Sequence, residues 1–206
     1  RELFADAPGG VVEVRESTIR VGDGESSASL LTLTGDEVVV GEGTHLKAEH
    51  ASGGGTIEVG GSWQNSDVAV RQAKRAVVEA GAVLDASAGD VGDGGEIVVW
   101  SDINDSESQT LVSGALRARG GKDHGDGGRI ETSGFMLDVY GIQIDAIAEK
   151  GINGIWLLDP RDIIIDIYDF SSGLTGIKYY GYFADNLSFF DTANVDSDAR
   201  FDSPFT

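Results

Sequence analysis

Residues 89–100 read GDVGDGGEIVVW, a cluster of glycine and aspartate that leads directly into a short apolar segment. A phosphate-binding loop would need a Lys-Ser or Lys-Thr pair, or a Gly-x-Gly-x-x-Gly spacing, followed by a helix. The residues from Glu96 to Trp100 are instead mainly β-branched and aromatic, which is typical of a strand. A phosphate loop is therefore excluded. Two interpretations stay open: a calcium-binding loop, and a corner of a repeating β-structure.

The same pattern occurs four times in the chain, which favours a repeating structure. Each copy has a short strand, a glycine, an apolar-x-Ala step, a glycine-rich corner and a second strand. The steps are Leu46-Lys47-Ala48, Leu84-Asp85-Ala86, Leu116-Arg117-Ala118 and Ile144-Asp145-Ala146. The interval between the steps shortens along the chain while the strand segments stay, which is typical of a solenoid that varies in its loops.

This repeat predicts an all-β fold, a parallel β-helix in which the chain forms a solenoid. Because side chains alternate along each strand, Leu84 and Ala86 should point inward and Asp85 outward. Equivalent residues of neighbouring coils stack about 4.8 Å apart, so the apolar residues and the alanines should form buried ladders. Glycines then occupy corners where φ is positive or where two coils approach closely. The opening stretch becomes such a corner, aligned with residues 120–128 (GGKDHGDGG).

Four aspartates in these two corners are candidate calcium ligands. Asp93 and Asp126 occupy equivalent positions, and Asp90 and Asp123 precede them by three residues each. Stacked carboxylates repel one another unless water or a cation separates them. The strict calcium-binding nonapeptide, Gly-Gly-x-Gly-x-Asp and an apolar residue, is not matched. Solvated corner acids are therefore the favoured interpretation and calcium is the alternative; no other cofactor is expected.

The composition narrows the range of partners. The net charge of −20 argues against nucleic acid and against an anionic membrane surface, because both attract basic proteins. No apolar run approaches the roughly 20 residues of a membrane span, so we expect no membrane insertion. The chain has no cysteine, which excludes disulfides and thiolate metal sites. It begins without methionine or a signal peptide, which suggests a piece of a longer or processed protein.

Four phrases carry a resemblance to a known family. They are GGTIEVGGSWQ (54–64), GAVLDASAGDVGDGGEIVVWSD (81–102), GALRARGGKDHGDGGRIETSG (114–134) and GIWLLDPRDIIID (154–166). In this order they resemble the filamentous-haemagglutinin-like adhesins, large bacterial exoproteins exported by two-partner secretion. The resemblance implies a right-handed parallel β-helix, secreted or at the bacterial cell surface. The amino-terminal secretion domain of that family is not recognised, so we expect that this stretch does not direct its own export.

Three regions follow from these observations. Residues 1–35 are expected to form the first coils or a cap, residues 36–166 the β-helix repeats, and residues 167–206 an aromatic-rich β tail. Ten of the sixteen aromatic residues lie in the last 48 positions. The segment GLTGIKYYGYFADNLSFFDT (173–192) resembles the opening of a PA14-type β-sandwich. Such a tail either caps its own last coil or pairs with another chain, and the sequence slightly favours pairing between chains.

Residues 66–80 (SDVAVRQAKRAVVEA) permit either an amphipathic helix or a loop followed by a strand. Alternation at Val68 and Val70 favours the loop and strand. The basic cluster of Arg71, Lys74 and Arg75 is then expected to be solvated rather than to bind a ligand.

Candidate catalytic groups are few. A polysaccharide-active β-helix enzyme needs converging carboxylates, or a basic residue with calcium. The candidates are Asp90, Asp93, Asp123 and Asp126, with His124 and Arg129 nearby. They lie beside glycines, where short acids commonly serve turn geometry. The other histidines, His45 and His50, add no metal-ligand spacing. We therefore expect no catalytic residue and no enzymatic activity.

The expected function is that of an adhesin stalk module that attaches to a host or neighbouring-cell surface, with a glycan as one candidate ligand. The first alternative is a structural subunit of an extracellular filament. It would self-associate, or bind a neighbouring exoprotein region, through β-helix stacking and strand addition. The second alternative is the polysaccharide-active enzyme.

Overall fold

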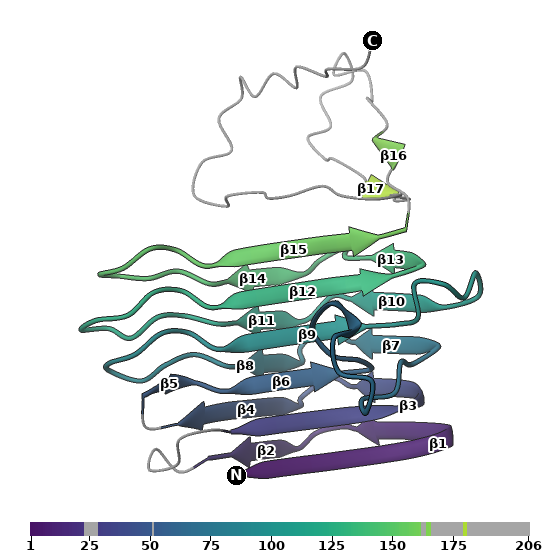
Figure 1. The fold of residues 1–206 in the computed structure, drawn as a ribbon, viewed down its shortest axis with the longest axis horizontal. Helices are drawn as coiled ribbons and strands as arrows, with labels where there is room; N and C mark the ends of the chain where they lie inside the picture. Colours follow the sequence, from purple (N-terminus) through teal and green to yellow (C-terminus); the bar gives the residue numbers. More distant parts are fainter. Residues whose placement is uncertain (23–28, 51, 162–163, 166–178, 181–206) are drawn as a thin grey trace.

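The computed structural model describes residues 1–22, 29–50, 52–161, 164–165 and 179–180, which form an all-β fold (Figure 1). The strands are β1 (Glu2–Val14), β2 (Thr18–Val21), β3 (Leu30–Val40), β4 (His45–His50), β5 (Gly53–Gly54), β6 (Thr56–Val59), β7 (Arg75–Val78), β8 (Val83–Asp85), β9 (Glu96–Trp100), β10 (Gln109–Val112), β11 (Ala115–Arg117), β12 (Arg129–Gly134), β13 (Met136–Asp138), β14 (Gln143–Asp145), β15 (Ile155–Pro160), β16 (Ile164–Ile165) and β17 (Tyr179–Tyr180). A 3-10 turn, η1 (Trp63–Asn65), is the only helical element in these ranges. Nothing helical in them is long and apolar enough to cross a membrane.

Two sheets of parallel strands make up most of the molecule. One has the order β13-β10-β7-β3-β6-β9-β12-β15, with β1 beside β3, and the other has the order β14-β11-β8-β4-β2, with β5 antiparallel to β4. The chain visits the same three positions in turn, first with β6, β7 and β8, then with β9, β10 and β11, then with β12, β13 and β14. Each such set is called a layer below. Figure 1 shows the layers following one another from β1 and β2 to β13, β14 and β15.

The predicted ladders are confirmed. Leu46 pairs with Leu84, Leu84 with Leu116, and Leu116 with Ile144. The first three are fully buried, and Ile144 is half-buried against the same core. The alanines behave in the same way, with Ala48, Ala86 and Ala118 fully buried and Ala146 half-buried. The core lies between the two sheets, because Leu31, Ile57, Ile97 and Ile130 of the larger sheet belong to it as well.

The ladder begins one layer earlier than the repeated phrases indicate. Ile19 of β2 pairs with Leu46, and Val21 pairs with Ala48. Strand β1 runs parallel to β3 and has one irregularity, between Ala7 and Val11. Residues 1–21 therefore continue both sheets.

Residues 66–80 form a loop followed by β7, as the alternation predicted. The basic cluster in this segment makes ion pairs within the protein. The pairs are Arg71 with Asp6 at 3.3 Å, Lys74 with Asp36 at 3.1 Å, and Arg75 with Glu37. These cations therefore join their segment to β1 and β3.

The predicted aromatic-rich tail, residues 167–206, lies outside the described residues except for β17. That strand pairs antiparallel with β16, Ile164 with Tyr180 and Ile165 with Tyr179. The PA14-type resemblance of this region stays a prediction.

Candidate functional site

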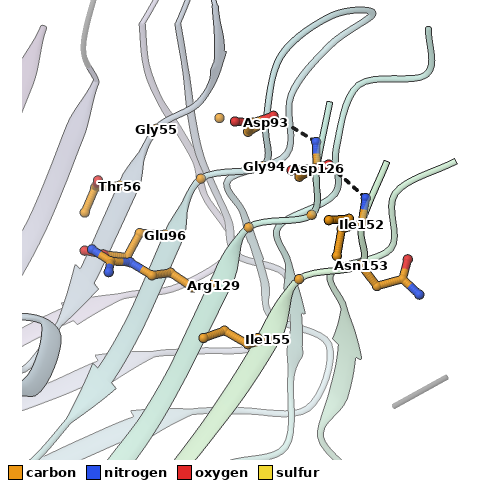
Figure 2. A pocket seen from close by; sticks show the side chains of 15 residues that line it. Gly55, Thr56, Asp93, Gly94, Glu96, Asp126, Arg129, Ile152, Asn153 and Ile155 are labelled. Carbon is orange, nitrogen blue, oxygen red and sulfur yellow. Dashed lines mark hydrogen bonds and ion pairs between the residues drawn. The ribbon is translucent and has the colours of Figure 1, made fainter. Parts of the chain in front are cut away.

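A groove follows the glycine corners across successive layers (Figure 2). It is lined by four aligned segments that lead into β6, β9, β12 and β15, namely residues 54–56, 93–96, 126–129 and 152–155. The stretch GDVGDGG thus lies in a corner. Val91 is bridged in parallel to His124, as the alignment with residues 120–128 requires.

The first glycine of each corner pair is required by the layer that follows. A Cβ at Gly54, Gly94 or Gly127 would lie less than 3.0 Å from a backbone carbonyl oxygen, closer than real Cβ atoms approach. Those oxygens belong to Ala86, Ala118 and Ala146, respectively. The alanine ladder and the first glycines of the corners therefore pack directly against each other.

The second glycine is required by the layer that precedes. A Cβ at Gly95 would meet the carbonyl oxygen of Gly55, and one at Gly128 would meet that of Gly95. The amide of Gly95 also donates a 2.8 Å hydrogen bond to the carbonyl oxygen of Ala86, which holds the corner against the ladder. The Gly-Gly signature thus results from close packing on both sides.

The last corner departs from this rule because Asn153 replaces the first glycine. No following layer faces this position in the described part of the chain, so a side chain fits there. The Oδ1 atom of Asn153 accepts a 3.0 Å hydrogen bond from the Ala148 amide. Gly154 keeps its glycine because a Cβ there would meet the carbonyl oxygen of Gly128.

Two of the predicted acids, Asp93 and Asp126, connect one layer to the next. The Asp126 amide donates to Asp93 Oδ1 at 2.8 Å, and the Ile152 amide donates to Asp126 Oδ1 at 2.8 Å (Figure 2). Each carboxylate therefore satisfies a backbone donor in the following corner. This contact explains why acids recur at equivalent positions.

The other two acids pair with lysines of the following corner. Lys122 Nζ lies 3.7 Å from Asp90 Oδ1, and Lys150 Nζ lies 3.6 Å from Asp123 Oδ1. All four side chains are exposed. Within the described ranges, no three His, Asp or Glu side chains are grouped so that they could hold a metal ion. Solvated corner acids stay the favoured interpretation, and calcium stays the alternative.

The strand side of the groove carries a second ladder, made by the first residue of each strand. Thr56 pairs with Glu96, Glu96 with Arg129, and Arg129 with Ile155. Glu96 and Arg129 form an ion pair, and the Arg129 guanidinium lies 4.3 Å from the centre of the Trp63 ring. Cation–π contacts of this kind contribute about 0.5–1 kcal/mol at exposed sites. Arg129, a candidate catalytic residue in the sequence, is therefore held by an acid and an aromatic ring.

Trp63 belongs to a loop whose position beside this site was not predicted from the sequence. Residues 61–72, called the strap below, lie against the outer face of β9 and β12. The Gln64 amide donates to Glu131 Oε2 at 2.8 Å, and Trp100 Nε1 donates to Gln72 Oε1 at 3.0 Å. Gln64 has a left-handed backbone, with φ of 46°, which is strained for a residue with a side chain.

Two carboxylates at outward strand positions are buried, and the strap contacts one of them, Glu131. Glu58 is 7% exposed and Glu131 is fully buried. Burial raises the pKa of Glu58, and it raises the pKa of Glu131 to about 7. Hydrogen bonds from the Gln64 amide and the Ser133 hydroxyl oppose the shift at Glu131. Sequence reasoning missed both acids; the available signal was the long interval between Leu46 and Leu84, which contains the strap.

Among solved structures, the chain is similar to the crystal structure of the HMW1 secretion domain from Haemophilus influenzae. The TM-score is 0.50, the sequence identity is 25%, and the match covers 77% of this chain and 42% of the other. The chain thus spans less than half the length of that domain. No family model and no curated protein matches the chain.

This likeness supports a loose relationship to a secretion domain and does not show a particular family. It agrees with the class of exported proteins that the sequence phrases resemble. It differs in one respect from the sequence-based expectation, which placed this stretch outside a secretion domain.

Proposed function

We propose that the chain is a non-enzymatic stalk module of a secreted or cell-surface exoprotein, and that it mediates surface attachment. In this proposal the stacked layers form a right-handed parallel β-helix. The observation that carries it is the unbroken parallel ladder from Ile19 to Ile144 around one core, in a chain similar to a secretion domain. A stack in which each layer contacts only its neighbours suits an elongated support.

The groove is the candidate attachment surface. Its Asp93, Asp126 and Arg129 side chains have partners within the protein, while Ile152 at its end is 76% exposed. Polar backbone beside an exposed apolar side chain suits a glycan, whose hydroxyls and apolar ring faces need both. The ligand class proposed is therefore a surface glycan of a host or neighbouring cell.

Adhesion of coated beads tests this proposal. We expect beads that carry the chain to adhere to epithelial or bacterial cells more than uncoated beads do. Glycosidase treatment of the cells should reduce that adhesion. The variant Ile152→Asp should bind several-fold less, because it places a charge at the end of the groove. The matched control is Val68→Asp, at a strap residue that is 95% exposed and does not line the groove.

Two outcomes would count against this assignment. Adhesion no higher than that of uncoated beads would contradict attachment by this part of the protein. Equal loss in the two aspartate variants would contradict the groove as the surface used.

A filament subunit is the second candidate, and open strand edges favour it. Within the described ranges β1 has a sheet neighbour on one side only, and unpaired edges permit strand addition. Asn153 disfavours it, because an in-register layer would bring a carbonyl oxygen against its side chain. Negative-stain images of discrete rods would support the stalk, and regular fibres would support the filament. The third candidate is a polysaccharide-active enzyme, which cleavage of a polysaccharide by the purified protein would support.

A further inference from the structure

The end of the stack formed by β13, β14 and β15 is incompletely covered by the described residues. Each of these strands has a parallel neighbour on one side only. Inward side chains at this end are partly buried, whereas their counterparts in earlier layers are fully buried. The partly buried ones are Ile142, Ile144, Ala146 and Trp156. An apolar end of this kind needs a cover in a protein that stays soluble.

A further copy of the repeat does not fit as that cover. At Gly54, Gly94 and Gly127 the next layer brings an alanine carbonyl oxygen to within 3.0 Å of where a Cβ would be. The equivalent residue at this end is Asn153, whose side chain is bound to the Ala148 amide. An in-register layer would therefore clash here, whether it came from the same chain or from a second copy stacked end to end.

The continuation of the same chain is the better candidate. Just after β15, the Arg161 guanidinium lies 5.3 Å from the centre of the Phe135 ring, and Phe135 immediately precedes β13. The next two described strands, β16 and β17, are antiparallel, and β17 contacts β13. Among the described strands none stacks in parallel on β15, and β16 and β17 lie at the uncovered end (Figure 1).

We propose that the chain that follows β15, of which β16 and β17 are described, covers the β13–β15 end of its own molecule. This segment contains ten aromatic residues, enough apolar surface to cover the half-buried side chains there. The sequence alone slightly favoured pairing of the tail with another chain. Asn153 and the contact between Arg161 and Phe135 favour the same chain instead. This inference is independent of the attachment function.

Introduced cysteines test the proposal directly, because the chain has none of its own. One cysteine replaces Met136 of β13, which is 46% exposed, and the second replaces Tyr179 or Tyr180 of β17. Two tail positions are used because disulfide geometry is restrictive. Under mild oxidation of dilute full-length protein, we expect most molecules of at least one pair to form an intrachain disulfide. Non-reducing electrophoresis and mass spectrometry would detect it.

The matched control places the first cysteine at Phe4 of β1, which is 50% exposed at the opposite end of the stack. We expect no intrachain disulfide in that control. Disulfide-linked dimers as the main product of the Met136 pairs would overturn the proposal in favour of pairing between chains. Absence of any cross-link from both Met136 pairs, or equal cross-linking from Phe4, would overturn it as well.

Discussion

Gly94 shows how the approach of neighbouring layers restricts a single residue. Its backbone φ is not in the left-handed region, so its glycine is required by space rather than by conformation. A methyl group at this position would meet the carbonyl oxygen of Ala118. The alanine is held in turn by the buried ladder, so neither side has room to move.

We expect Gly94→Ala to lower the free energy of unfolding by about 3 kcal/mol, at the upper end of overpacking costs. Urea denaturation followed by circular dichroism measures the effect. Gly89→Ala is the matched control, because nothing lies within 4 Å of the place its methyl group would take and its φ is not left-handed. That variant should stay within about 0.5 kcal/mol of the wild type. Similar losses in both variants would contradict the close-approach account.

The corner aspartates give a second prediction at this scale. Because Asp93 and Asp126 already accept backbone hydrogen bonds, we expect a chelator to leave the melting temperature unchanged. Calcium that bridged the corners would stabilise the folded state by mass action. A fall of several degrees in chelator, reversed by added calcium, would contradict this expectation and support the calcium alternative.

At the scale of elements, the strap and β12 enclose a carboxylate that titrates near neutral pH. Burial raises the pKa of Glu131 to about 7, and the nearby acids Asp159 and Glu96 add to the shift. In the unfolded chain the same group has its ordinary pKa of 4.5. Because the folded-state pKa is the higher one, its stabilising contribution is complete below pH 4.5. It is lost as the pH rises to 7.

We expect this loss to reach about 3 kcal/mol for the wild type, from a shift of that size. The variant Glu131→Gln cannot ionise, so its stability should fall much less between pH 4.5 and 7. Denaturant unfolding at a series of pH values measures both slopes. The control Glu107→Gln, at an exposed carboxyl between β9 and β10, should keep the wild-type slope. An unchanged slope in Glu131→Gln would show that burial does not shift this group as described.

The two kinds of element differ in how well the sequence predicts them. The ladder was predictable because Leu84 and Ala86 belong to a short motif that recurs, and stacking preserves its spacing. The strap was not predictable, because its main contact joins Gln64 to Glu131, 67 residues away, and neither residue belongs to a periodic pattern. The first layer does not match the motif, because Val21 takes the place of the ladder alanine, although Ile19 continues the apolar positions.

At the scale of the molecule, ion pairs connect layers that are distant in sequence. The Arg15 guanidinium donates to both carboxylate oxygens of Glu79, at 2.6 and 2.7 Å, and lowers the pKa of Glu79 to about 2. These residues flank β1 and β7, with β3 between those strands in the sheet. With a net charge of −20, the protein places much of its limited positive charge in such contacts. The net charge could be predicted from the composition. Which charged residues pair with each other could not, because that depends on the register of the strands.

The close stacking of layers also determines the length of the molecule. Each layer adds about 4.8 Å of height, the distance between paired strands. The interval from Leu116 to Ile144 would span roughly 90 Å if fully extended. The folded stack is therefore much shorter, and stiffer, than the extended chain would be. In the proposed stalk, the number of layers therefore sets the distance between the two ends of the stack, and with it the distance between the base and any segment attached at the other end.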